Sequence, residues 1–293
     1  MTVRRVEITR PDKLLWPSLG ISKQASAEYL GKVAGRMLPW LRDRPLSLVR
    51  APDGVEGERY YQKDTPKYAP SWIRTVTIPA PSAKRDVAYT VCNDEDTLRW
   101  LGNQAALEFH PAPVRRDRLD RPDLLVVDID PPEGEFEAAV EVAFLVLEVM
   151  DDLGLKPLVK TTGGKGLHVV VPIERRYSQN QLRHAAGRLA ETVIERRPDL
   201  VTAEFRKAKR GDRVMLDPSR NGAGATIIAP YSPRARAEGT ISFPVSPAEL
   251  GSISPEDFTL VTVPDRLKGA GPRAWTKAAR ARAQRLPSML LRD

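Results

Sequence analysis

Two aspartates at the end of an apolar strand give the strongest chemical signal in the sequence. Residues 124–127 are Leu-Leu-Val-Val, and Asp128 and Asp130 follow with one residue between them. Side chains two positions apart on a strand point to the same face, so these carboxylates lie side by side and repel each other. A hard divalent cation with oxygen ligands would relieve that repulsion. The alternative interpretation is an exposed pair of aspartates at a strand end, which is common.

A second apolar strand ends in a carboxylate within a basic part of the chain. Asp217 follows a short apolar run, and residues 204–236 include eight basic and three acidic side chains. Asp217 could complete a carboxylate triad with the first two aspartates, as two-metal phosphoryl transfer requires. Arg220 and Arg234 could hold phosphate oxygens. The alternative is an ordinary solvated basic surface.

A glycine-rich turn joins two further predicted strands. Residues 161–168 are Thr-Thr-Gly-Gly-Lys-Gly-Leu-His. Glycines let the backbone approach a ligand closely and turn its N–H groups toward an anion. The Thr162 hydroxyl and the Lys165 ammonium suit phosphate, although the spacing is not that of a P-loop. The alternative is a hairpin turn with a solvated lysine.

The three histidines give weaker signals. His110 precedes a proline at the expected end of a helix, His168 lies on a predicted strand, and His184 lies on an amphipathic helix. Each kind of position more often holds a structural or exposed histidine than a catalytic one. The residues themselves therefore leave the roles of His110 and His168 open.

Composition excludes several classes of protein. Of the 293 residues 41% are hydrophobic and 29% charged, so the chain is not disordered and suffices for one large or two smaller domains. Its single cysteine, Cys92, excludes a disulfide framework. Neither a membrane span nor a signal peptide is apparent, so we expect a soluble protein of a reducing compartment. The net charge of +8 permits a nucleic-acid partner without establishing one.

Strand and helix patterns alternate along the chain. We expect strands at residues 123–129, 158–161, 167–171, 214–216 and 226–228, and helices at 25–38, 136–153, 178–196, from 93 or 94 to about 109, and at 274–285. This order predicts an α+β fold with mixed sheets flanked by helices, rather than a doubly wound parallel sheet. We expect a single domain over residues 1–293. It would comprise an N-terminal module to about residue 90, a catalytic core to about residue 260 and a basic C-terminal helix.

The ordered set of motifs resembles a known family. Along the chain come D-K-x-x-x-P-x-x-G-x-[ST]-K, E-x-H-P, D-x-D-P, [ST]-G-[GS]-K-G-x-H and D…R-N-G-x-x-x-T…A-P-Y-S-x-R. This set is similar to the polymerase domain of bacterial ligase D, in the archaeo-eukaryotic primase superfamily, from about residue 10 to residue 260. The resemblance implies a primase-polymerase catalytic fold and a free-standing form without a ligase module.

The resemblance also implies the nucleotide site. Asp128, Asp130 and Asp217 would hold two divalent ions, Mn²⁺ in preference to Mg²⁺, and His110 would act beside them in catalysis. The residues that would bind the nucleotide are Thr162, Gly164, Lys165, His168, Arg210, Arg220, Arg234 and Tyr61.

Two lysines and two tyrosines match family positions that contact DNA or a base. Lys13 and Lys23 would recognise the 5′-phosphate of a downstream strand, and Lys23 follows the expected helix cap Ser22, where an anion is favoured. Tyr60 or Tyr61 would stack on a base. The alternatives are solvated lysines and half-buried strand tyrosines.

The implied function is a template-directed nucleotidyltransferase that fills short gaps and extends ends in DNA repair, in end joining or in excision repair. Its partners would be gapped or broken duplex DNA with a 5′-phosphate, ribo- or deoxyribonucleoside triphosphates, and a separate ligase or Ku. We expect a monomer in the bacterial cytoplasm, associated with the nucleoid and not with a membrane. The alternatives are a two-metal nuclease, which would not need the triphosphate-binding cations, and a non-catalytic DNA-end-binding module, which would gain from losing its aspartates.

Overall fold

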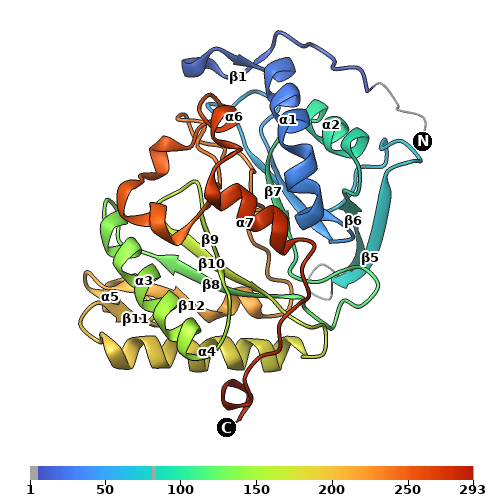
Figure 1. Cartoon of the computed structure of the whole chain (residues 1–293). Coiled ribbons are helices and arrows are strands. Elements are labelled where there is room, and N and C mark those ends of the chain that lie inside the picture. The colour runs from blue at the N-terminus through green and yellow to red at the C-terminus, as the bar shows by residue number, and fades with distance from the viewer. Residues whose placement is uncertain (1–5, 81–83, 293) are drawn as a thin grey trace. The chain divides into compact units, whose positions relative to one another are not determined.

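The computed structural model describes residues 6–80 and 84–292, which form two compact units (Figure 1). The first unit contains the chain up to residue 117 together with residues 226–242 and 258–267. The second contains residues 118–225, residues 243–257 and the chain from residue 268 on. The single functional domain, with module boundaries near residues 90 and 260, stays a prediction.

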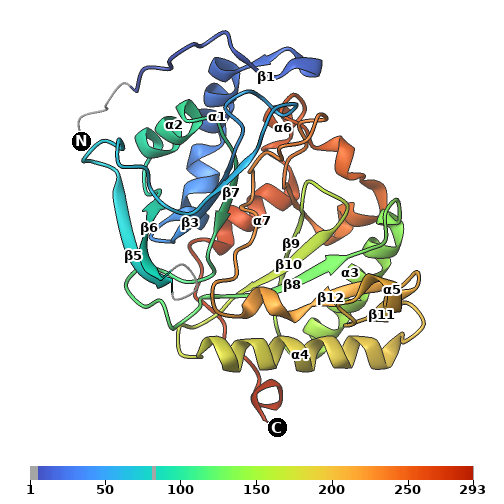
Figure 2. The same ribbon diagram turned by 180° about the vertical axis from the view of Figure 1, so that it is seen from behind.

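In the described part of the first unit, a five-stranded sheet packs with helices. Its strands are β3 (Leu46–Arg50), β4 (Tyr60–Gln62), β5 (Arg74–Ala80), β6 (Arg85–Val91) and β7 (Ala106–Pro111), in the order β4-β3-β6-β5 with β7 paired to β3. A two-stranded ladder of β1 (Leu14–Trp16) and β2 (Ile21–Ser22) precedes α1 (Lys23–Leu41). α1 packs on α2 (Glu95–Asn103) and on the short α6 (Val263–Arg266) (Figure 2). The predicted cap is confirmed, because the Ser22 hydroxyl accepts a hydrogen bond from the Ala25 N–H.

The helix expected to reach Phe109 ends earlier, so that prediction was wrong. α2 ends at Asn103, and Ala105 adopts a positive φ of 53° before β7 begins. Leu107 and Phe109 are fully buried on β7, which pairs with β3 and accepts a hydrogen bond at Phe109 from the Ala229 N–H. Tertiary pairing on both edges thus outweighed a helical spacing of apolar residues.

The strand expected at residues 226–228 is also absent as a regular strand. That segment runs along β7 instead, where the Ile227 N–H donates to the Pro111 carbonyl at 3.2 Å. The expected basic helix at 274–285 is α7 (Ala270–Ala278), which starts and ends earlier. Its Trp275 is buried and donates from Nε1 to the Val159 carbonyl at 2.9 Å, so this helix packs on the core of the second unit.

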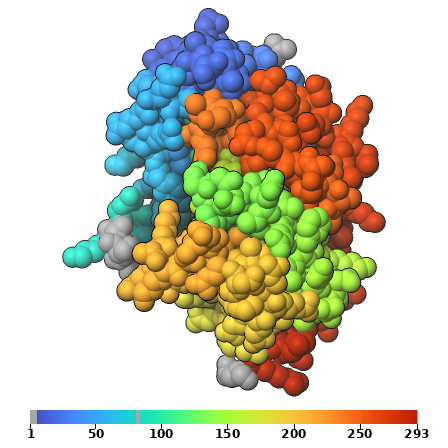
Figure 3. Space-filling model, turned by 90° about the vertical axis from the view of Figure 1, so that its left-hand side faces the viewer, coloured from blue at the N-terminus to red at the C-terminus, as the bar shows by residue number. Residues whose placement is uncertain are grey.

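Within its described residues, the second unit is built on a six-stranded mixed sheet. The order is β11 (Val201–Thr202), β12 (Val214–Asp217), β8 (Leu124–Asp130), β10 (Leu167–Pro172), β9 (Leu158–Thr161) and β13 (Pro244–Val245). Only the β11–β12 pair among these is parallel. α3 (Phe136–Asp152) and α4 (Gln179–Arg196) pack on the sheet and on each other, and α5 (Lys207–Arg210) lies before β12. On the surface of this unit, the segment near residue 130 (green) adjoins the segment near residue 210 (amber) (Figure 3).

This architecture confirms the predicted α+β fold with mixed sheets flanked by helices. Every residue of β8 up to Ile129 is buried, which explains the uninterrupted apolar run in front of the aspartates. α4 begins with a capping box, in which Ser178 accepts from the Gln181 N–H and the Gln181 side chain accepts from the Ser178 N–H. None of the helices in residues 6–80 and 84–292 combines the length and apolarity of a membrane span.

Gly271 and Gly187 provide a paired test of helix packing in the second unit. A Cβ on Gly271 would lie 2.5 Å from the Val245 Cα, so Gly271→Ala must displace α7 from β13. We expect the free energy of unfolding to fall by roughly 1–3 kcal/mol. No atom lies within 4 Å of the Cβ position at Gly187 in α4, so Gly187→Ala should stabilise the protein by roughly 0.5–1 kcal/mol. Urea denaturation of both variants measures the two changes, and a stable Gly271→Ala protein would contradict the close contact.

Candidate active site

The three predicted aspartates lie on one face of the β8–β12 pair. Asp128 and Asp217 are directly opposite each other in the antiparallel ladder, and Asp130 follows two residues later on β8. Facing side chains in such a ladder are about 5 Å apart, so the carboxylates are close neighbours. Asp128 and Asp217 are buried, and Asp130 is partly exposed.

Arg220 links the two buried carboxylates. Its Nε donates to Asp128 Oδ2 at 2.8 Å and lies 3.5 Å from Asp217 Oδ2. Burial raises the pKa of Asp128, but the contacts with His168 and Arg220 outweigh burial and hold that pKa well below its ordinary value. Burial alone would lower the pKa of Arg220, but the nearby carboxylates outweigh burial and raise that pKa above its ordinary value. Asp128 is therefore an anion, and Arg220 a cation, throughout the physiological range.

Asp130 is paired with two cations from other parts of the second unit. Lys165, in the turn between β9 and β10, places its Nζ 3.1 Å from Oδ1 and also donates to the Pro131 carbonyl. Arg210, at the end of α5, donates to Oδ2 at 3.1 Å and to the carbonyl oxygens of residues 204 and 205, which fix its guanidinium. Each predicted aspartate thus contacts a side chain that the sequence analysis assigned to phosphate.

A turn after β12 sets the position of Arg220. Pro218 ends the strand because it cannot donate a ladder hydrogen bond, and residues 218–221 form a 3₁₀ turn. The fully buried side chain of Asn221 then donates to the Val126 carbonyl and accepts from the Val126 N–H, both at 2.8 Å. The Asn221 side chain thus makes the hydrogen bonds to β8 that the backbone of a neighbouring strand would make. The sequence did not predict this role. The available signal was a proline directly after a strand with an asparagine three residues later.

His168 faces Asp128 from the neighbouring strand. The two are Cα partners in the β10–β8 ladder, with His168 Nε2 3.3 Å from Asp128 Oδ1. Burial and the positive charge of Lys160 lower the pKa of His168 to about 4. Its buried Nδ1 has no hydrogen-bond partner among the residues that the structure describes. The imidazole is therefore neutral near pH 7, and its Nε2–H points toward Asp128.

The glycine-rich turn packs against the end of β8. The Thr162 hydroxyl donates to the Gly166 carbonyl at 3.0 Å and accepts from the Gly164 N–H at 3.3 Å. A Cβ on Gly166 would overlap the Ile129 carbonyl oxygen, so only glycine permits this approach. The close packing brings Lys165, between these glycines, to Asp130.

The chemistry of the donors fits a hard divalent cation. Carboxylate oxygens are the ligands that Mg²⁺ and Mn²⁺ prefer, and Asp128, Asp130 and Asp217 supply them on one face of the sheet. In the described part of the chain, no group of three or more His, Cys, Asp and Glu side chains is gathered closely enough to hold a metal. Arg220 lies between two of the carboxylates instead. A metal ion there would take over the neutralisation that the arginine provides.

In the first unit, His110 and Arg234 contact Glu108, and Tyr61 contacts His110. His110 lies two residues after Glu108 on β7, with its Nε2 2.8 Å from Glu108 Oε2. Arg234 Nε lies 3.4 Å from Glu108 Oε1. The Tyr61 ring meets the His110 ring edge-on, with 6.3 Å between centroids. Glu108 is the first residue of the E-x-H-P motif, and the sequence predicted no role for it.

Lys13 and Lys23 line one small pocket of about 150 Å³ in the first unit. Lys23 is buried, and burial together with the charges of Arg10, Lys13 and Arg50 lowers its pKa. Arg10 and Arg50 line the same pocket and were not predicted to do so. Four cationic side chains that repel one another around a small cavity favour an anion of the size of phosphate.

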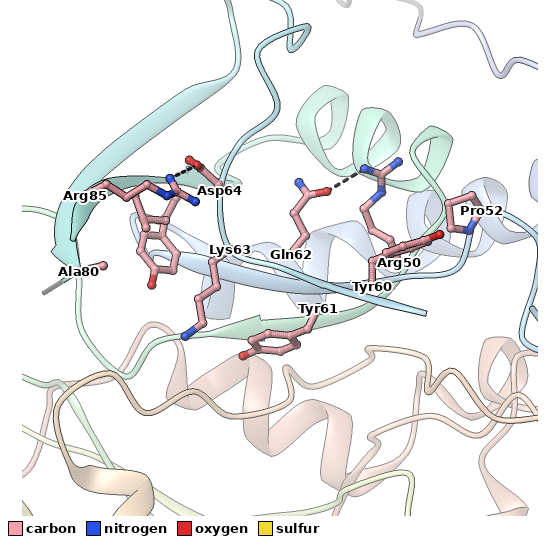
Figure 4. Close-up of a pocket in the computed structure, with 11 residues that line it drawn as sticks. Arg50, Pro52, Tyr60, Tyr61, Gln62, Lys63, Asp64, Ala80 and Arg85 are labelled. Atoms are coloured by element: carbon pink, nitrogen blue, oxygen red, sulfur yellow. Dashed lines mark hydrogen bonds and ion pairs between the residues drawn. The ribbon is translucent and has the colours of Figure 1, made fainter. Parts of the chain in front are cut away.

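A larger pocket of about 800 Å³ lies beside β4 and β6 of the first unit (Figure 4). Its aromatic and charged lining residues are Arg50, Tyr60, Tyr61, Lys63, Asp64, Arg85 and Tyr89. Tyr60 and Tyr61 lie on β4 and are 48% and 54% exposed, so part of each ring is accessible. Lys63 Nζ lies 5.8 Å from the centre of the Tyr61 ring, and Arg85 is paired with Asp64. Exposed aromatic rings among cations suit unpaired nucleic-acid bases.

Comparisons with known proteins give a consistent result. The model of the family described as "LigD, primase-polymerase domain" matches residues 22–275. The multifunctional non-homologous end joining protein LigD of Mycolicibacterium smegmatis is 34% identical over 91% of this chain, and the bifunctional LigD of Bacillus subtilis is 32% identical over 91%. The chain spans only 35% and 43% of the lengths of these relatives.

A solved structure is similar over nearly its whole length. It is the polymerase domain of Mycobacterium tuberculosis ligase D in complex with DNA, with a TM-score of 0.85 and 30% identity. The match covers 91% of this chain and 96% of that one.

The neutral buried imidazole of His168 predicts a pH dependence of stability. Between pH 6.5 and about 4 the unfolded chain protonates this histidine and the folded chain does not. The free energy of unfolding should therefore fall with pH in this window, by up to about 1.4 kcal/mol per pH unit. Urea denaturation at pH 7, 6 and 5 should show this slope reduced in His168→Gln and kept in His184→Gln. Equal slopes in His168→Gln and the unmodified protein would contradict the assignment.

Proposed function

Because the chain belongs to the LigD primase-polymerase domain family, we propose that it is a template-directed nucleotidyltransferase that extends DNA 3′ ends during repair. One observation carries the proposal: the carboxylate face of β8 and β12 has cationic side chains at each carboxylate. Phosphoryl transfer needs oxygen ligands for divalent ions and cations for a triphosphate in one place. The similarity to a solved polymerase domain supports the same assignment.

Asp128, Asp130 and Asp217 would hold two divalent ions, Mn²⁺ in preference to Mg²⁺. Such ions would supply activation of the attacking hydroxyl and stabilisation of the charge on the transferred phosphoryl group. The chain's own residues that bind the triphosphate are Thr162, Gly164, Lys165, Arg210 and Arg220. The neutral ring of His168 orients the Asp128 carboxylate, and its lack of charge keeps that carboxylate available to a cation.

In the reaction, the primer 3′-oxygen forms a bond to the α-phosphorus of the nucleotide, and pyrophosphate leaves with the bridging oxygen. Arg220 and Lys165 bind the phosphate oxygens, which suit them as well as the carboxylates they contact here. Among the residues of the first unit, His110 acts in catalysis and Arg234 binds the phosphates. Tyr61 stacks on the base. The chain acts as a single primase-polymerase domain over residues 1–293.

DNA binds through the first unit. The pocket of Lys13 and Lys23 takes the 5′-phosphate of a downstream strand, and the exposed tyrosines of the larger pocket stack on unpaired bases. The net charge of +8 favours this polyanion. The similar solved domain, described as bound to DNA, supports this part of the proposal.

The biological setting is the joining of broken DNA in a bacterial cytoplasm, at the nucleoid. The names of the relatives support end joining over gap filling in excision repair. The protein acts as a monomer on ribo- or deoxyribonucleoside triphosphates, with a separate ligase or Ku. A nuclease is not favoured, because it needs no triphosphate-binding cations. A non-catalytic end-binding module is not favoured either, because three aspartates on a DNA-binding surface repel the backbone.

Extension of a primer on a short-gapped duplex tests the catalytic proposal. With Mn²⁺ present, Asp128→Asn should lose about a thousandfold in rate, equivalent to about 4 kcal/mol of transition-state stabilisation. Asp152→Asn is the matched control, since Asp152 is an exposed carboxylate on α3 that pairs with Arg196. Circular dichroism checks folding. Extension by Asp128→Asn at the unmodified rate would exclude the proposed ion site.

Binding of duplexes with and without a 5′-phosphate at the gap tests the lysine pocket. The unmodified protein should bind the duplex with the 5′-phosphate more tightly, by about tenfold or more, because a charge-assisted hydrogen bond contributes about that much. Lys23→Gln should bind both duplexes equally. Lys13→Gln should do the same, although Lys13 also pairs with Asp53 at 2.6 Å. Lys32→Gln, an exposed lysine on the same helix, is the control. An unchanged preference in both pocket variants would place the phosphate elsewhere.

A further inference from the structure

Glu108 is a buried carboxylate that touches two of the predicted nucleotide-site residues. Its side chain is 9% exposed. Oε2 lies 2.8 Å from His110 Nε2, and Oε1 lies 3.4 Å from Arg234 Nε. Oε1 also accepts a hydrogen bond from the Ala235 N–H at 2.9 Å. One side chain thus contacts an imidazole, a guanidinium and the backbone that carries the guanidinium.

Glu108 is ionised despite its burial. Burial raises its pKa, but the hydrogen bond with His110 and the charge of Arg234 outweigh burial and bring the pKa below its ordinary value. A buried anion is retained only where partners compensate for its lost hydration. Those partners are the two side chains that the proposed reaction requires in fixed positions.

The strand geometry explains how these groups meet. Glu108 and His110 are two residues apart on β7, so their side chains share a face. The segment at residues 229–235 is tied to the same strand, because Ala229 donates to the Phe109 carbonyl and the Phe109 N–H donates to the Ser232 hydroxyl. The bond from Ala235 to Glu108 closes this loop just after Arg234.

We propose that Glu108 is a positioning residue that holds His110 in the tautomer with its proton on Nε2 and directs the Arg234 guanidinium. The inference rests on the proposed nucleotidyltransferase function. With the Nε2–H engaged by Glu108, His110 is left with Nδ1 as a hydrogen-bond acceptor. Glu108 itself does not touch the nucleotide and acts only through these two side chains.

The substitution Glu108→Gln separates positioning from a merely structural role. The amide keeps an oxygen of the same shape for the Ala235 N–H. Its NH₂ group, however, donates toward His110 Nε2, which must then accept, and its neutral head no longer attracts Arg234. The backbone loop therefore stays closed while the histidine tautomer and the arginine position change.

Steady-state extension kinetics give the functional readout. We expect Glu108→Gln to lower kcat and raise KM for the nucleoside triphosphate, with kcat/KM down by about tenfold to a hundredfold. In a His110→Ala, Arg234→Ala background, the same substitution should change kcat/KM by no more than about threefold, because its two targets are gone. Glu191→Gln, an exposed carboxylate on α4 paired with Arg188, is the control with unchanged kinetics. Equal losses in both backgrounds would overturn the proposal.

NMR of ¹⁵N-labelled histidine tests the inference without relying on activity. Spectra assigned with His110→Ala should show the His110 proton on Nε2 in the unmodified protein and on Nδ1 in Glu108→Gln. The same tautomer in both proteins would overturn the positioning role. If the unmodified protein extends no primer, the proposed function fails, whereas the tautomer change still decides whether Glu108 orients His110.

Discussion

Repulsion among three carboxylates on one face of the β8–β12 pair is the constraint on which the second unit depends. At the separation of about 5 Å typical of facing strand residues, two such charges repel by about 3 kcal/mol at an effective dielectric constant of 20. Ion pairs offset this repulsion: Arg220 lies at the buried pair, and Lys165 and Arg210 lie at Asp130. These ion pairs leave each of the three carboxylates beside at least one cationic side chain.

Turns rather than long helices or strands position two of these cations, Lys165 and Arg220. Gly166 lets the β9–β10 turn lie against the Ile129 carbonyl, which brings Lys165 to the end of β8. Asn221 takes over the Val126 hydrogen bonds that a longer β12 would have made, and so fixes the turn that carries Arg220. In both cases a turn at the end of a strand sets the position of a charged side chain.

The first unit uses the opposite arrangement of charge at its small pocket. Burial and, after it, the charges of neighbouring cations lower the pKa of Lys23, so this pocket is suited to gain an anion. Glu108 shows the complementary case, in which a buried anion is satisfied by His110, Arg234 and a backbone N–H. A buried charge is retained where partners compensate for its lost hydration, and Glu108 has such partners among the described residues.

Local sequence determined a large share of this protein. The period of two along β8 places Asp128 and Asp130 on one face, the Ser22 hydroxyl begins α1, and the order of motifs indicates the family. Only the tertiary structure decided that Asp217 lies opposite Asp128, that β7 replaces the end of a helix, and that Glu108 joins His110 to Arg234. The physical reason is that strand register and buried ion pairs depend on the collective packing of segments far apart in the chain. A local pattern of polar and apolar residues fixes the face on which a side chain lies, but not the partner that it meets.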